Sequence, residues 1–186
     1  MLKAPRGAFC YHKTMDHEPV PTEELIKVGV IKGHEALEWL DSHGEYVYHG
    51  STQRLDRLEP RQASHDGEPD GQPAVAASDN PEIATFRALV SSHASRESGR
   101  GHHYSSFGVK DGKVCYEASS ADLEAARSDD AVGYVHVFRR GDFDPYPRHD
   151  YEFRSGLAVE PRYIIEVRAS DLPPDIGVSD NPSSKS

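Results

Sequence analysis

"EYVYHGST", residues 45–52, is the stretch that decides how this chain folds. Residues 46–48 form a short aromatic and β-branched run, which is typical of a strand, and His49 follows at its end. A strand end fixes an imidazole, Gly50 lets a ligand approach the backbone, and Ser51 offers a hydroxyl. The pattern favours a ligand-binding strand end, although a histidine that closes an apolar strand is also typical of a hydrogen-bonded core residue.

Upstream and downstream of this strand the sequence changes character. Residues 22–43 repeat apolar residues at helical spacing, with Thr22 as N-cap, and they fit one helix or two that break near Gly33. Residues 56–73 are rich in Gly, Pro, Asp and Ser and have no period, which predicts a long loop. Long loops in compact domains are often lids or binding loops, so we interpret this one as a lid.

The rest of the chain alternates further strands with two helices. Residues 74–78 predict a short strand, and Pro81 begins a helix that Asp79 or Asn80 caps. The Asp111-Gly112 pair between two half-apolar runs predicts a β-hairpin. The remaining predicted elements are a short helix from Ser119 or Ser120 and strands over 133–140 and 162–168.

The order of these elements predicts the fold class. A helix, strand, loop, strand and helix are followed mostly by strands, which excludes a regular βαβ alternation and favours an α+β domain with curved or split antiparallel sheets. We expect an N-terminal arm over 1–21, a single domain over 22–172 and a flexible polar tail over 173–186.

Composition limits the classes of function. The 186 residues carry a formal net charge of −10, which argues against a protein that binds nucleic acid through its overall field. Two cysteines, Cys10 and Cys115, are too few for a disulfide framework and indicate a reducing compartment. No apolar run reaches the length of a membrane span or a secretion signal, so we expect a cytoplasmic protein without membrane partners.

Histidine is frequent, since the chain has 11, but the spacing does not predict a metal site. His102 and His103 are adjacent, and neighbouring strand residues point to opposite faces. The others show no zinc-ligand spacing, so we expect no bound metal.

Three segments together resemble a known family. "YVYHGST" (46–52) resembles the first motif of the ADP-ribosyltransferase-like fold, especially the poly(ADP-ribose) polymerase branch, and it is similar in the related RNA 2′-phosphotransferases. "PAVAASDNPEIATFRAL" (73–89) looks like the second motif and "YEFRSGLAVEPRYIIEV" (151–167) like the third. The resemblance implies split antiparallel β-sheets with flanking helices and NAD bound between two sheets.

The same resemblance implies roles for individual residues. His49 would hydrogen-bond a ribose hydroxyl of NAD, beside Gly50, and Ser51 would contact the nicotinamide amide. Ser78, at the end of the second-motif strand, would line the cofactor site. Glu152 would polarise the 2′-hydroxyl of the nicotinamide ribose, which suits a reaction that develops oxocarbenium character.

Two of these roles have competitors within the chain. The family tyrosine that stacks on nicotinamide has no counterpart, so Phe86 or Tyr104 would flank the ring, although the helical spacing of Phe86 fits a core residue. Alternatives to Glu152 as the catalytic carboxylate, which lie in the same segment or end the hairpin, are Glu160, Glu166 and Glu117.

These observations predict an NAD-dependent ADP-ribosyltransferase-like protein that transfers ADP-ribose to an unspecified acceptor, protein or nucleic acid, or hydrolyses NAD. An RNA 2′-phosphotransferase-like enzyme is the first alternative, and it would hold phosphates with Arg54, Arg87 and Arg154. The second is a non-catalytic interaction domain of the same fold. The sequence indicates neither the acceptor nor the oligomeric state.

Overall fold

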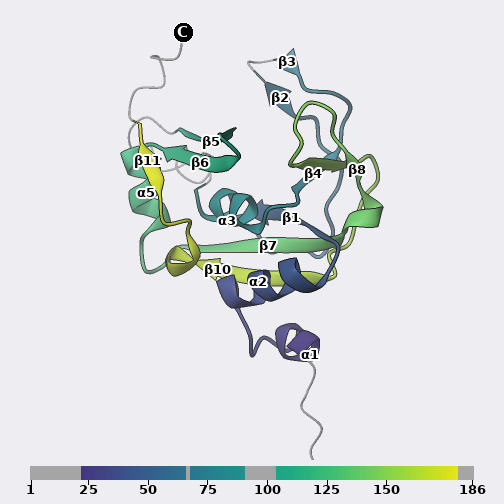
Figure 1. Ribbon diagram of the computed structural model, residues 1–186, viewed down its shortest axis with the longest axis horizontal. Coiled ribbons are helices and arrows are strands. Elements are labelled where there is room, and N and C mark those ends of the chain that lie inside the picture. Colours follow the sequence, from purple (N-terminus) through teal and green to yellow (C-terminus); the bar gives the residue numbers. More distant parts are fainter. Residues whose placement is uncertain (1–21, 66–67, 91–103, 180–186) are drawn as a thin grey trace, which may run out of the picture.

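The computed structural model describes residues 22–65, 68–90 and 104–179. Over these residues the chain is a mixed α+β fold, as the order of predicted elements indicates, with a six-stranded sheet and a smaller three-stranded sheet (Figure 1). The N-terminal arm predicted over 1–21 lies outside the described residues.

The six-stranded sheet is antiparallel throughout and has the order β10-β7-β1-β4-β9-β8. Its strands are β1 (Tyr46–Ser51), β4 (Val75–Ser78), β7 (Val132–Arg139), β8 (Asp144–Pro145), β9 (Glu152–Ser155) and β10 (Tyr163–Arg168). Strand β1 pairs with β7 along the whole length of β1, whereas β1 and β4 share one registered pair, Tyr48 with Ser78. The sheet is therefore continuous on one side of β1 and only loosely joined on the other.

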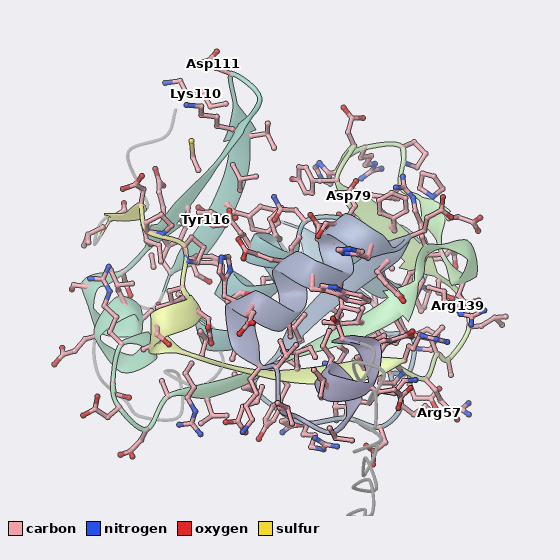
Figure 2. All side chains as sticks on the ribbon, turned by 60° about the horizontal axis from the view of Figure 1, so that its bottom comes forward. Arg57, Asp79, Lys110, Asp111, Tyr116 and Arg139 are labelled. Atoms are coloured by element: carbon pink, nitrogen blue, oxygen red, sulfur yellow. The ribbon has the colours of Figure 1, made fainter. Side chains whose placement is uncertain are left out.

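The second sheet has the order β11-β6-β5, with β5 (Ser105–Lys110), β6 (Lys113–Ala118) and β11 (Ile176–Val178). The predicted hairpin is confirmed, since Asp111 and Gly112 both adopt positive φ, at 52° and 74°, between β5 and β6. Its tip, with Lys110 and Asp111, projects away from the body of the protein (Figure 2). Strands β2 (Ser64–His65) and β3 (Glu68–Pro69) form a separate two-stranded ribbon.

The helices form where capping and apolar spacing predict them. The first helical region is two helices, α1 (Thr22–Lys27) and α2 (Gly33–His43). Helix α3 (Pro81–Leu89) is capped by Asn80, whose side chain accepts from the N–H of Glu82, and α5 (Ser120–Ala126) is capped by Ser119. Single 3-10 turns occupy Arg140–Asp142 and Ala169–Asp171.

Two apolar clusters cover the two faces of the large sheet. Helices α2 and α3 pack on one face, where Leu37, Phe86 and Val135 belong to a cluster that also includes Tyr116 of the small sheet. Helix α3 thus lies between the two sheets (Figure 1). On the other face a smaller cluster surrounds Phe138 and Phe153. Burial on both faces explains the near-continuous apolar sequence of β7.

The C-terminal boundary differs from the expectation. Residues 173–186 were expected to form a flexible tail from residue 173 onward, yet Ile176–Val178 pair in parallel with β6 as β11. This strand joins the sheet by main-chain hydrogen bonds, and its three residues are half-buried or exposed. A hydrophobic pattern therefore gives no signal for it. The domain accordingly extends past residue 172.

Candidate functional site

The candidate site lies where β1 and β4 separate. The side chain of His49, one residue past the Tyr48–Ser78 pair, reaches across to β4, and its Nδ1 lies 2.7 Å from the carbonyl oxygen of Ala76. A carbonyl only accepts hydrogen bonds, so Nδ1 carries the proton. The neutral ring therefore presents Nε2 as an acceptor, and Nε2 has no hydrogen-bond partner in the described part of the chain.

The electrostatic surroundings keep His49 neutral. Burial lowers the pKa of this imidazole, and the positive charges of Arg87 and Arg61 lower it further. On its other side the ring lies 6.1 Å from that of His136, which is fully buried. His136 accepts from the N–H of Leu55 through Nε2, and burial lowers its pKa to about 4. Both rings are thus uncharged at neutral pH.

Gly50 has a packing role that the sequence did not suggest. A Cβ on Gly50 would overlap the carbonyl oxygen of Ala84 and lie 2.7 Å from the amide nitrogen of Ala88. Because both atoms belong to the backbone of α3, the glycine allows that helix to lie directly against β1. The close packing of α3 against β1 is therefore sufficient to require glycine at this position, independently of any ligand.

The hydroxyls of Ser51 and Ser78 have local partners. The Ser51 oxygen accepts from the N–H of Gln53 at 3.0 Å, and the buried Ser78 oxygen accepts from the N–H of Asn80 at 3.1 Å. Each hydroxyl stabilises the turn that follows its strand. Ser51 is half-buried whereas Ser78 is buried, so Ser51 is the more accessible of the two.

Glu152 is held in place by an arginine on its own strand. Its Oε1 accepts from Nε of Arg154 at 2.6 Å, and Arg154 in turn contacts Oδ2 of Asp70 at 2.7 Å. The guanidinium of Arg154 lies over the ring of Tyr146, with 3.5 Å from Cζ to the ring centroid. The side chains of Glu152, Asp70 and Arg154 are 19%, 15% and 12% exposed, so the pairs are shielded from solvent.

The same contacts fix the loop that we interpreted as a lid. Asp70 also accepts from the hydroxyl of Tyr146 at 2.8 Å, and main-chain bridges join Leu58 to Val159 and Arg61 to Ala74. Nearby Arg154 lowers the pKa of the Asp70 carboxyl, with a further contribution from Tyr146. The base of the loop is therefore fastened to the large sheet, and motion of the whole loop would break these contacts.

Arg87 is a main residue of the candidate site, although the sequence analysis considered it only for the RNA 2′-phosphotransferase alternative. It projects from α3, and its Cζ lies 5.0 Å from the ring centroid of Phe107. Although the residue is solvent-exposed, nearby protein atoms lower the pKa of its guanidinium, against the opposing effect of the charge on Glu152. Within the described residues Arg87 makes no ion pair. A guanidinium without an ion-pair partner can bind an anionic group of a ligand through charge-assisted hydrogen bonds.

The aromatic residues near Arg87 are not the predicted ones. Phe86 is 1% exposed and packs 5.0 Å from the ring of Tyr116, so it is a core residue and has no free face for nicotinamide. The hydroxyl of Tyr104 pairs with Ser106 on the small sheet at 2.7 Å. The rings that do reach this region are Phe107 and Tyr151, 5.4 Å apart. They link the two sheets, and strand alternation alone gave no reason to single them out.

Strand register decides which predicted residues share a face. Tyr48 pairs with Ser78, and Ser78 pairs with Glu152, so these three side chains lie on the face that α3 covers. His49 pairs with His136, and its Cβ starts on the opposite face. Glu152 and His49 therefore do not point into one common cavity. A ligand that contacts both must lie at the end of the β1–β4 ladder.

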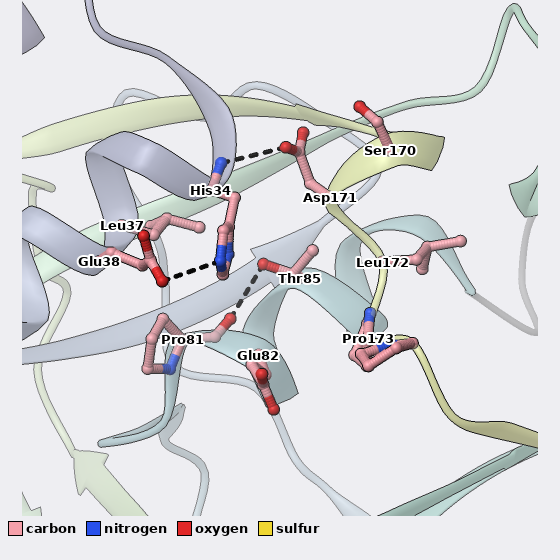
Figure 3. A pocket seen from close by; sticks show the side chains of 11 residues that line it. His34, Leu37, Glu38, Pro81, Glu82, Thr85, Ser170, Asp171, Leu172 and Pro173 are labelled. Atoms are coloured by element: carbon pink, nitrogen blue, oxygen red, sulfur yellow. Dashed lines mark hydrogen bonds and ion pairs between the residues drawn. The ribbon is translucent and has the colours of Figure 1, made fainter.

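Two cavities in the described residues lie elsewhere. One, of about 290 Å³, is bounded by α2, the start of α3 and the segment 170–174 (Figure 3). There His34 pairs with Glu38 at 3.1 Å, and Asp171 accepts from the N–H of His34. The other, of about 440 Å³, lies beside β10. Neither cavity is lined by His49, Arg87 or Glu152.

Over residues 22–65, 68–90 and 104–179, no three or more His, Cys, Asp or Glu side chains are grouped to hold a metal ion. None of the helices in those ranges combines the length and apolar composition needed to cross a bilayer. Comparisons of the chain with protein-family models, with curated proteins and with solved structures found no match.

Proposed function

We propose that the junction of β1, β4 and α3 binds NAD, and that the chain is an ADP-ribosyltransferase-like protein that transfers ADP-ribose to an acceptor or hydrolyses NAD. The observation that supports this most is an imidazole of fixed tautomer, His49, near enough to the cation Arg87 for that charge to lower the pKa of the imidazole. The order of the three motifs, which resembles that of the family, agrees with the proposal. The finer description of the fold as ADP-ribosyltransferase-like belongs to the same proposal.

The chemistry of NAD suits the groups at this junction. Nε2 of His49 would accept a hydrogen bond from a ribose hydroxyl, and Arg87 would balance charge on the pyrophosphate. Arg154 occupies one oxygen of Glu152, so the second oxygen is the one that would orient the 2′-hydroxyl of the nicotinamide ribose. A fixed carboxylate stabilises positive charge that develops as the nicotinamide bond breaks.

The direct test is binding of NAD to the full chain. Calorimetry and thermal unfolding at millimolar NAD should show heat and a raised melting temperature, because a ligand of the native state stabilises it. Arg87→Ala should weaken both effects, whereas Arg139→Ala, at an exposed site on the periphery, should not (Figure 2). Absence of heat and of stabilisation in the wild type would favour a non-catalytic interaction domain instead.

A second candidate function, RNA 2′-phosphotransfer, is favoured by the cations around His49. Arg61 and Arg87 both lie close enough to lower the pKa of that imidazole, and two arginines suit a phosphate ligand. Of the arginines first considered for this role, Arg54 lines the cavity beside β10 and Arg154 is paired with two carboxylates. NAD consumption that requires 2′-phosphorylated RNA would identify this reaction, and consumption without RNA would exclude it as the main one.

A further inference from the structure

Strand β10 is the outer strand of the large sheet, and on one of its sides no strand of the described residues lies next to it (Figure 1). On the inner side it pairs with β7 over its whole length. An unpaired edge exposes main-chain N–H and C=O groups that can bind a further strand. The edge of β10 is therefore a possible binding surface if its outward groups are unoccupied.

The hydrogen-bonding phase of the sheet shows which groups point outward. Just beyond the β1–β7 ladder, the N–H of Arg140 donates to the carbonyl oxygen of Glu45 at 2.9 Å. This bond fixes the phase of the ladder, so Phe138, His136 and Tyr134 of β7 direct their main-chain groups toward β1. The residues of β7 between these direct their main-chain groups toward β10, as Val135 does toward its partner Ile165. The alternate residues of β10 must then direct their main-chain groups away from the sheet.

Those outward residues are Ile164 and Glu166. The same phase applies to Arg168, and its N–H indeed donates to the side chain of Asp171 at 2.8 Å rather than to β7. Over the described residues, Ile164 and Glu166 have no main-chain hydrogen bond on the outer side. Two N–H and two C=O groups are thus available along this edge.

A groove of about 440 Å³ follows this edge. One wall is β10 and the other is the connection between α1 and α2. That connection contributes the apolar Ile31, and Val28 and Val30 in the same segment are 70% and 66% exposed. The groove offers an apolar wall beside a row of main-chain groups, which is the arrangement that binds an extended peptide.

The charge of the groove is opposite to that of the chain. Four cations and one acid line it, although the protein as a whole has a formal charge of −10. Lys27 is paired with Glu24 and Arg162 with Glu23, but Lys32 and Arg54 have no ion-pair partner among the described residues. Charge complementarity therefore selects an acidic occupant.

We infer that this groove binds an extended acidic segment of a partner protein, which adds a strand to β10. A second copy of the chain fits less well. Its own β10 edge carries the same cations, so two such edges would repel each other. This inference is independent of the proposed NAD site, because β10 lies two strands away from β1.

The test begins with selection of random eight-residue peptides by the full chain. The selected peptides should be enriched in Asp and Glu with alternating β-branched residues, and the tightest of them should slow hydrogen exchange at the amides of Ile164 and Glu166. N-methylation along that peptide should weaken binding at every second position only, because alternate amides face β10. The double variant Lys32→Glu/Arg54→Glu should weaken binding at least about fivefold.

The matched control is Lys110→Glu/Arg139→Glu, which changes charge equally at exposed sites away from the groove and should leave affinity unchanged (Figure 2). Enrichment of basic or neutral peptides, no selected peptide, or equal effects of the two double variants would overturn the inference. Protection of Ile164 and Glu166 without peptide would also overturn it. Such protection would point to a second copy if it depends on protein concentration, and to another segment of this chain if it does not.

Discussion

The Nδ1 atom of His49 lies 2.7 Å from the carbonyl oxygen of Ala76, so an imidazole bridges two strands at the point where their ladder ends. A side chain here takes the place of a main-chain hydrogen bond. The link contributes to stability and also fixes the tautomer that the proposed NAD site requires.

His49→Ala should affect stability and NAD binding to different extents. Loss of the bond to Ala76 should cost about 1 kcal/mol of unfolding free energy, and the thermal stabilisation by NAD should disappear. His43→Ala is the control, because Nδ1 of His43 likewise bonds a carbonyl, that of Trp39 at 2.9 Å, at an exposed helix end. Unchanged NAD stabilisation in His49→Ala would remove His49 from the site.

Glu152→Gln should lower turnover without unfolding the protein. The amide oxygen of glutamine can still accept from Arg154, so NAD binding and melting temperature should stay near wild type, while NAD consumption should fall about 100-fold or more. Glu166→Gln is the matched control, since Glu166 is also paired with an arginine, Arg168, at 2.6 Å. Equal turnover in wild type and Glu152→Gln would exclude this carboxylate from the reaction.

Gly50→Ala should be strongly destabilising. The added methyl group meets the α3 backbone at Ala84 and Ala88, which cannot move without disturbing the core, so a loss of about 3 kcal/mol or more is expected in urea unfolding. Gly108→Ala in β5 is the control, because a Cβ there has no heavy atom within 4 Å. A stable Gly50→Ala protein would show that α3 can shift away from β1.

Acidification should destabilise the protein through His136. Burial lowers its pKa from 6.5 to about 4, so the unfolded chain binds more protons than the native state between these values. The contribution to stability is complete above pH 6.5 and is lost as the pH falls toward 4, by up to about 3 kcal/mol. The lowered pKa of His49 acts in the same direction.

The measurement is urea unfolding at several pH values between 4 and 7. His136→Gln should show a shallower dependence on pH than wild type, whatever its absolute stability. Val135→Ala, a buried change on the same strand without a titratable group, should lower stability but keep the wild-type dependence on pH. Identical slopes for wild type and His136→Gln would mean that this imidazole does not titrate with unfolding.

Local signals predicted the elements of the fold well. Asn80 before Pro81, the Asp111-Gly112 pair and the aromatic run into His49 each act over a few residues, and each gave the expected structure. Strand β11 escaped prediction because it depends on main-chain pairing with a strand about 60 positions earlier in the chain. Such pairing leaves little trace in composition.

The candidate site was less predictable than the fold, because it depends on long-range register. Alternation along a strand places Tyr48 and His49 on opposite faces, but spacing cannot tell that Glu152 shares the face of Tyr48. Nor can it tell that Phe86 is enclosed by Tyr116 or that Arg154 is taken by Asp70. Arg87 did carry a signal, since it follows Phe86 and precedes Ala88 and Leu89 in a mostly apolar helix, where a charged residue is uncommon.

The fastening of Asp70 to Arg154 and Tyr146 has a practical consequence for engineering. The segments on both sides of the β2–β3 ribbon are held in place, by the bridge between Arg61 and Ala74 and by the contacts of Asp70, so a change within the ribbon is separated from the large sheet. The pairing of β2 with β3 already brings the two ends of their connection together. Extra residues inserted there therefore add only a small loop-closure entropy cost to folding. An epitope or a fluorescent label grafted there would report on this protein without disturbing either sheet.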